Sequence, residues 1–110
     1  MLPKSKRATS SHIDELAKGK KTLSGAFFTM SVRFVKNPLE ISRFAVIVSK
    51  KVAKTAVSRN KLRRQAYSAL ENKDIFLPAG MICAFYAKKE AEKAQYADLS
   101  RDISELISKI

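Results

Sequence analysis

The stretch SKKVAKTAVSRNKLRR, residues Ser49–Arg64, is the feature around which this 110-residue chain is organised. It carries seven Lys and Arg side chains and no Asp or Glu. The acid-free window is wider still, because no acidic residue lies between Glu40 and Glu71. Repulsion within such a block weakens the compact state, so we expect an anionic partner to offset it.

The second part of this stretch predicts a helix. Thr55 is a suitable N-cap residue, and no Pro or Gly lies between it and Leu70. Apolar residues then recur at helical spacing and form one stripe that we expect to face a core. These residues are Leu62, Ala66, Ala69 and Leu70.

Polar side chains are predicted to form a wall beside this stripe: Arg59, Asn60, Arg63, Arg64 and Tyr67, with Lys61 further round the helix. Guanidinium groups match phosphate oxygens, an Asn amide both donates and accepts, and a Tyr ring can stack. The combination predicts a surface for a nucleic-acid backbone. A merely solvated face is the alternative, and it fits less well because such faces usually intersperse Glu among their Lys and Arg.

Val46–Val52 followed by Ala56–Arg64 resembles the protein subunit of bacterial ribonuclease P. That family carries Ser-Lys-Lys at the end of a strand and, after a loop, an Arg-Asn-Arg motif that opens a basic helix. The matching residues are Ser49, Lys50, Lys51, Arg59, Asn60, Arg63 and Arg64, while Lys61 replaces the second Arg of the motif. The opening Leu2–Lys4 and the later Leu77–Gly80 are also similar to the family, so the resemblance covers nearly the whole chain.

The resemblance implies a non-catalytic subunit of a ribonucleoprotein. Its partners would be a catalytic RNA, which holds Mg²⁺ and removes the 5′ leader, and precursor tRNA, with no obligate protein partner. Which of the two RNAs each basic side chain meets is left open. The residues expected to bind RNA are Lys50, Lys51, Lys54, Arg59, Asn60, Lys61, Arg63 and Arg64, together with His12 and Phe27.

Aromatic residues set this chain apart from the family pattern. A short family helix presents two rings, four residues apart, that line the substrate cleft, and the corresponding positions here are His12 and Leu16. His12 can still stack on a base, whereas Leu16 offers only apolar contact. The family also often has a ring near the position of Ser31.

Composition limits the possible functions. The net charge is +12, and residues 1–70 hold 16 Lys and Arg against 3 Asp and Glu, whereas residues 71–110 hold 6 against 7. We therefore expect the anionic partner to meet the first two thirds of the chain. The length predicts one domain over residues 1–110, of which 1–10 form a basic arm.

Several classes of function find little support in the sequence. Cys83 is the only cysteine, which excludes an internal disulfide, suits a reducing cytoplasm and predicts a small buried side chain. One His and one Cys cannot build a zinc site. No apolar run is long enough to span a membrane, and Met1–Arg7 is not followed by the apolar stretch of a signal peptide. The acids are dispersed, so we do not expect the polypeptide alone to cut RNA.

The order of expected elements predicts an α+β fold. Ser11–Gly19 should form a short helix, Leu23–Val35 one strand with alternating faces, Arg43–Val48 a central strand and Met81–Ala87 the last strand, with a short additional strand conceivable after residue 35. The mixed strand face, with Phe27, Ser31 and Arg33, and the basic helix should enclose a cleft for single-stranded RNA. Glu90–Ile110 should form an amphipathic helix whose acids face away from RNA.

The resemblance implies a specific version of this fold. It is a two-layer sandwich of a mixed β-sheet and packed helices, with a left-handed βαβ crossover, and it is also found in a ribosomal-protein domain. Two other functions stay open: a ribosomal-type or general RNA chaperone without a role in cleavage, and a DNA-binding module. The spread of Arg around the helix and the lack of a dimer seam argue against DNA.

Overall fold

The computed structural model describes residues 21–34, 42–72 and 81–109. The basic arm 1–10 and the helix expected at Ser11–Gly19, with His12 and Leu16, lie outside the described residues, as does the segment after residue 34. The described elements are β1 (Lys21–Ser24), β2 (Phe28–Phe34), β3 (Arg43–Ile47), α2 (Ala56–Asn72), β4 (Met81–Ala87), the 3₁₀-helix η2 (Lys89–Lys93) and α3 (Tyr96–Ser108).

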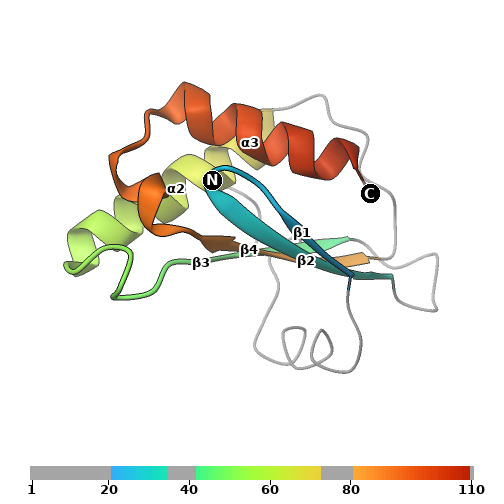
Figure 1. Ribbon diagram of the computed structural model, residues 1–110, viewed down its shortest axis with the longest axis horizontal. Coiled ribbons are helices and arrows are strands. Elements are labelled where there is room, and N and C mark those ends of the chain that lie inside the picture. The colour runs from blue at the N-terminus through green and yellow to red at the C-terminus, as the bar shows by residue number, and fades with distance from the viewer. Residues whose placement is uncertain (1–20, 35–41, 73–80, 110) are drawn as a thin grey trace.

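The four strands form one mixed sheet in the order β1-β2-β4-β3. β1 with β2 and β2 with β4 are antiparallel, whereas β3 and β4 are parallel and are connected through α2. Both helices lie over the same face of the sheet, so the molecule has two layers (Figure 1). The predicted α+β sandwich with a βαβ crossover unit is confirmed.

The register gives the sheet two different faces. Toward the helices, Phe28 and Met30 of β2 stand beside Phe85 of β4, and the rings of Phe28 and Phe85 meet edge to face with centroids 6.2 Å apart. The apolar stripe of α2 and Leu99, Ile103 and Leu106 of α3 complete this core, as their spacing predicted. The opposite face is mixed, with a small apolar cluster of Ala45, Ile82 and Ala84 next to Thr29, Ser31 and Arg33.

The single strand expected at Leu23–Val35 was wrong, because the chain turns between Ser24 and Phe28. The carboxylate of Asp102 on α3 accepts three backbone N–H groups in this turn: those of Ala26 (2.8 Å), Phe27 (3.0 Å) and Phe28 (2.9 Å). A Cβ on residue 25 would come within 2.5 Å of the same carboxylate, so Gly25 is required there by close approach. Residue alternation could not reveal a turn whose stabilising group lies 76 residues away in the sequence.

The C-terminal segment also differs from the expected single helix over Glu90–Ile110. It divides into η2 and α3, because Ala94 and Gln95 take extended backbone angles between them. Ala91 of η2 is fully buried in the core. Its burial fixes the 3₁₀ segment against the rest of the molecule.

Strand β4 and its cysteine follow the prediction. β4 spans Met81–Ala87, and Cys83 is completely buried. Burial among apolar side chains raises the pKa of the Cys83 thiol, because the thiolate would lose its hydration. The side chain therefore acts as a small hydrophobic residue. Within the described ranges, no helix is long and apolar enough to cross a membrane.

Candidate RNA interface

The basic surface begins where the β3–α2 loop enters α2. Thr55 caps the helix as predicted, since its Oγ1 accepts the N–H of Ser58 at 3.1 Å and its carbonyl accepts the N–H of Arg59 at 3.1 Å. No acidic side chain lies in the first turn of α2. The positive end of the helix dipole therefore adds to the positive charge of the Lys and Arg side chains around it.

Arg59 links the helix to the loop that precedes it. Its Nη1 donates to the carbonyl oxygens of Ala53 at 3.0 Å and Lys54 at 3.1 Å, and the side chain is half-buried. Val52 and Ala53 are buried, and both of their N–H groups bond the carbonyl of Ser49. These contacts give the loop a defined shape that holds the exposed Lys50, Lys51 and Lys54 at the end of α2.

Asn60 and Arg63 form a pair one helical turn further on. An Nη2 of Arg63 donates to Oδ1 of Asn60, so the amide orients the guanidinium group. Arg64 is exposed and lies about 100° further round the helix than Arg63. Lys61 is also exposed and lies on the other flank of the helix. The predicted residues are therefore gathered on the first turns of α2, although they cover three sides of the helix.

Tyr67 does not belong to this surface, contrary to the prediction. It is buried, and its hydroxyl oxygen accepts the N–H of Val46 at 3.1 Å. Val46 lies on β3, which is an edge strand among the described strands, so its outward N–H groups face no other described strand. Tyr67 therefore satisfies one outward N–H group of β3. Arg63 lies one helical turn before Tyr67 and Arg59 two turns before it, so Arg59 and Arg63 share one flank of α2.

The proposed cleft also needs correction. α2 packs on the apolar face of the sheet, whereas Ser31 and Arg33 lie on the opposite face. In the described part of the chain, the basic helix and the mixed strand face therefore lie on opposite sides of the sheet. Phe27 belongs to the turn before β2 and packs against the main core, so it does not share a strand face with Ser31 and Arg33.

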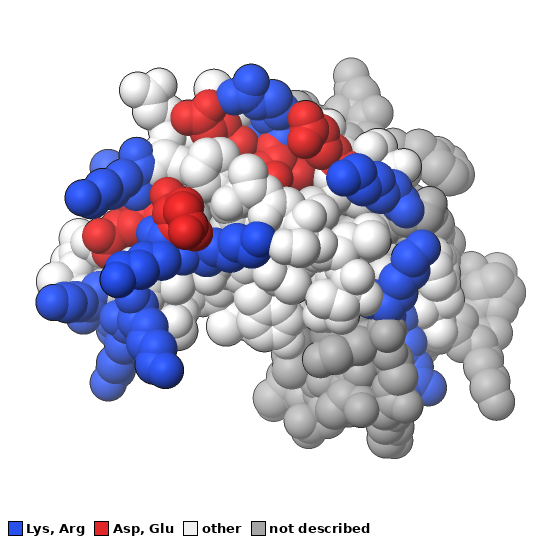
Figure 2. All heavy atoms as spheres, viewed as in Figure 1, with Lys and Arg blue, Asp and Glu red and all other residues white. Residues whose placement is uncertain are grey.

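The charges of this surface are not neutralised within the described part of the chain. Away from this surface, Arg101 pairs with Asp98 at 2.6 Å on α3. Figure 2 shows many Lys and Arg side chains at the end of the molecule where the β3–α2 loop, α2 and η2 meet, with the carboxylates of η2 among them, and further carboxylates over α3. Among the described residues, no such ion pair involves the exposed Lys50, Lys51, Lys54, Lys61 and Arg64 or the half-buried Arg63.

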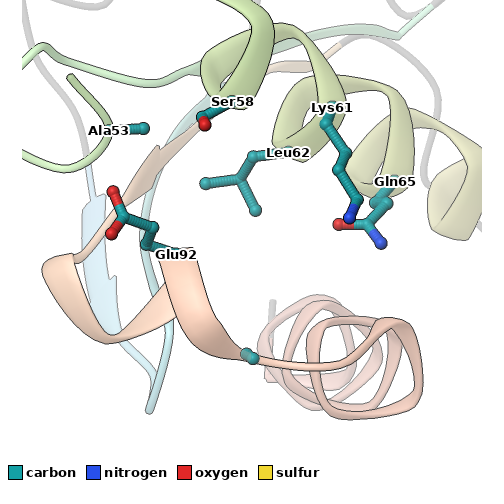
Figure 3. Close-up of a pocket in the computed structure, with 7 residues that line it drawn as sticks. Ala53, Ser58, Lys61, Leu62, Gln65 and Glu92 are labelled. Carbon is teal, nitrogen blue, oxygen red and sulfur yellow. The ribbon is translucent and has the colours of Figure 1, made fainter. Parts of the chain in front are cut away.

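Two hollows flank the start of α2 on the side of η2. One has a volume of about 150 Å³, and Lys61, Leu62 and Gln65 project toward it from α2 while Glu92 approaches from η2 (Figure 3). The other, of about 500 Å³, brings Lys89 and Lys93 of η2 together with the loop lysines. The sequence pattern missed these two lysines, because acidic neighbours balance them in the charge of the C-terminal segment.

Comparison with known proteins decides the family. A family model described as Ribonuclease P matches residues 2–110. The chain belongs to the ribonuclease P protein family. It is also 29% identical over 85 residues to the "Ribonuclease P protein component" of Pseudanabaena sp. (strain PCC 6903), covering 77% of this chain and 72% of that protein.

Solved structures agree on the fold. The ribonuclease P protein from Thermotoga maritima superposes with a TM-score of 0.81 at 19% identity, covering 94% of this chain and 96% of the other. The Staphylococcus aureus ribonuclease P protein gives a TM-score of 0.76 at 18% identity, covering 93% and 90%. These matches show the fold, and the family match supports a role in tRNA processing. The two alternatives, RNA chaperone and DNA-binding module, gain no support from these matches.

Proposed function

We propose that this protein binds the catalytic RNA of ribonuclease P and the 5′ leader of precursor tRNA, and that the RNA subunit performs the hydrolysis. The observation that carries the proposal is the group of exposed, unneutralised cations on the first turns of α2 and the loop before it. Such a surface attracts phosphate backbones and releases their counterions. The proposal places the protein in the cytoplasm, together with its RNA partners.

Each part of the surface has a role in this mechanism. Arg63, oriented by Asn60, and Arg64 contact phosphates directly, while Arg59 holds the loop that presents Lys50, Lys51 and Lys54. The leader runs along the Arg59–Arg63 flank and around the β3 edge toward the mixed face of the sheet. His12 and Phe27 are retained as predicted RNA contacts from the sequence.

Mg²⁺ is assigned to the RNA subunit. The described surface around α2 is cationic and would repel a divalent cation, whereas RNA phosphates attract one. Lys and Arg side chains replace part of the cation atmosphere that two RNA strands need when they approach closely. We therefore expect the protein to lower the Mg²⁺ concentration that cleavage requires.

Reconstitution tests the proposal. The protein is mixed with a bacterial ribonuclease P RNA and precursor tRNA at low Mg²⁺, and the cleavage rate is measured. The protein should raise the rate sharply, and the double change Arg59→Ala with Arg63→Ala should remove the gain. The pair Arg101→Ala with Lys109→Ala removes the same charge from α3 and its C-cap and should retain the gain. A wild-type protein that gives no gain would contradict the assignment.

Salt dependence gives a second measurement. If the protein neutralises about four leader phosphates, log affinity should fall with log salt at a slope near −3, since each single-strand contact contributes about −0.7. The quantity to compare is the slope for precursor tRNA with and without its leader. If the slope of log affinity against log salt is the same with and without the leader, the leader does not bind the cationic surface of this protein.

A further inference from the structure

Two charged side chains from distant parts of the chain hold the turn between β1 and β2. Asp102 of α3 accepts three consecutive N–H groups of this turn. Lys88, the residue after β4, donates from Nζ to Ser24 Oγ and to the carbonyl of Gly25, both at 2.6 Å. We call Asp102, Lys88 and the turn that they bond the turn clamp.

The turn clamp extends into η2 through the backbone of Lys88. Lys88 is the N-cap residue of η2, and no side-chain hydrogen bond caps this helix. The N–H of Lys88 bonds the carbonyl of Phe27 at 2.8 Å, and its carbonyl accepts the N–H of Ala91 at 2.9 Å. Hydrogen bonds therefore lead without interruption from Asp102 through the turn to the first turn of η2.

The position of η2 matters because this helix carries two lysines of the larger hollow. Lys89 and Lys93 are exposed, form no ion pair with any described residue, and line the hollow together with Lys51 and Lys54. A 3₁₀-helix of five residues is too short to be stable by itself, so its place depends on contacts with the rest of the molecule. The described contacts that hold η2 include the turn clamp at its start and the buried Ala91 in its middle.

The two clamp residues differ from the cations around the hollow. Asp102 is only 5% exposed, and all three of its hydrogen bonds go to the turn. Lys88 is half-buried, and its ammonium group already has two acceptors in the turn. Lys88 therefore belongs to the fold, although it stands directly before Lys89 in a basic pair. A site works best when such supporting residues fix the groups that contact the ligand.

We infer that Asp102 and Lys88 are positioning residues for RNA binding. They hold η2 at the distance from α2 at which Lys89 and Lys93 act together with the lysines of the β3–α2 loop, and they do not contact RNA themselves. The inference rests on the proposed function, because it requires that the cationic surface binds RNA. It gives a buried carboxylate of α3 a role in binding a polyanion.

The direction of the effect of Asp102→Asn tests this inference. Affinity for a bacterial ribonuclease P RNA is measured at 0.1 M salt, well below the Tm of each variant. The substitution raises the net charge by one, so charge alone would strengthen RNA binding. The turn clamp predicts the opposite: affinity should fall about fivefold and the salt slope should become less negative by about 1. Asp98→Asn makes the same charge change on the same helix and should leave affinity within about twofold of wild type.

Lys88→Met provides a second variant, in which the hydrogen bonds of Asp102 remain. It should lower RNA affinity about threefold, whereas Lys109→Met, with the same charge change, should stay within about twofold of wild type. Both clamp substitutions are then repeated in a protein with Lys89→Ala and Lys93→Ala. Most of their effect should disappear there, because the clamp acts through these two lysines and coupled sites are not additive.

Circular dichroism shows which variants are folded, and only folded variants are compared. If Asp102→Asn is unfolded, Lys88→Met and its repeat without the two η2 lysines decide the question. If wild type stimulates cleavage and folded Asp102→Asn binds RNA as tightly as wild type or more tightly, the inference fails and the proposed function stands. An effect of Lys88→Met that persists in full without Lys89 and Lys93 also overturns the inference, because Lys88 then contacts RNA directly.

Discussion

Helices α2 and α3 cover the same sheet face, yet they use their charged residues differently. Around the start of α2, Lys and Arg are exposed and have no anionic partner among the described residues. On α3, Asp102 is buried and holds the β1–β2 turn, and Asp98 pairs with Arg101. The carboxylates of Asp98 and Asp102 on α3 thus bond other groups of the protein, whereas the Lys and Arg side chains at the start of α2 remain available to bind a partner. Replacing the buried Asp102 of α3 should change stability, and replacing the Lys and Arg side chains at the start of α2 should change RNA binding.

Asp102→Ala should have the largest effect. Three backbone N–H groups lose their acceptor, and we expect the free energy of unfolding to fall by about 3 kcal/mol and Tm by about 10–20 °C. Thermal and urea unfolding measure both quantities. Asp98→Ala, which removes an exposed carboxylate from the same helix, should cost less than about 1 kcal/mol. Equal costs for the two variants would contradict the role of the buried carboxylate.

Arg63→Ala with Arg64→Ala should mainly weaken RNA binding. Losing two phosphate contacts should lower affinity for RNA about 30-fold at 0.1 M salt and make the salt slope less negative by about 1.5. Filter binding across a salt series gives both values. Arg101→Ala with Lys109→Ala provides the same charge change on α3. If that pair weakens binding equally, net charge rather than the α2 surface governs RNA affinity.

Tyr67→Phe distinguishes the core from the interface within α2 itself. The change leaves the buried N–H of Val46 without an acceptor and should cost about 1–2 kcal/mol of stability. RNA affinity should be the same as that of wild type, because the ring does not face the basic surface. Chemical unfolding and RNA binding are both measured. A loss of RNA affinity with unchanged stability would instead show that Tyr67 belongs to the RNA-binding surface, as the sequence predicted.

Thr55→Ala should have the smallest effect of the four. It removes the side-chain acceptor for the N–H of Ser58 and should destabilise the protein by about 1 kcal/mol, whereas Thr55→Ser should retain the cap. Gln95 precedes α3 without a side-chain cap bond, so Gln95→Ala should cost only a few tenths of a kcal/mol. Denaturant midpoints compare the three variants. Similar costs at Thr55 and Gln95 would show that the cap contributes little.

Much of the fold could be predicted from local patterns. Helical spacing gave α2 with its buried stripe, and the run Met81–Ala87 gave β4. The turn at Gly25–Phe27 escaped prediction because its stabilising carboxylate comes from α3. Tyr67 was misplaced because helical spacing gives a position around the axis but does not show how wide the buried side is. The pairing of Lys89 and Lys93 with the loop lysines depends on where η2 packs.

The strong basic character of the chain, the concentration of its cations before and within one helix, and the resemblance of this pattern to the ribonuclease P protein can all be read from the residues alone. These are properties of composition and short-range spacing. Which charged side chains bond other parts of the chain and which face solvent depends on packing between segments that are distant in the sequence. Asp102 and Lys88 look like surface residues in the sequence, and packing makes them fix the hairpin turn through contacts that span 63 residues or more.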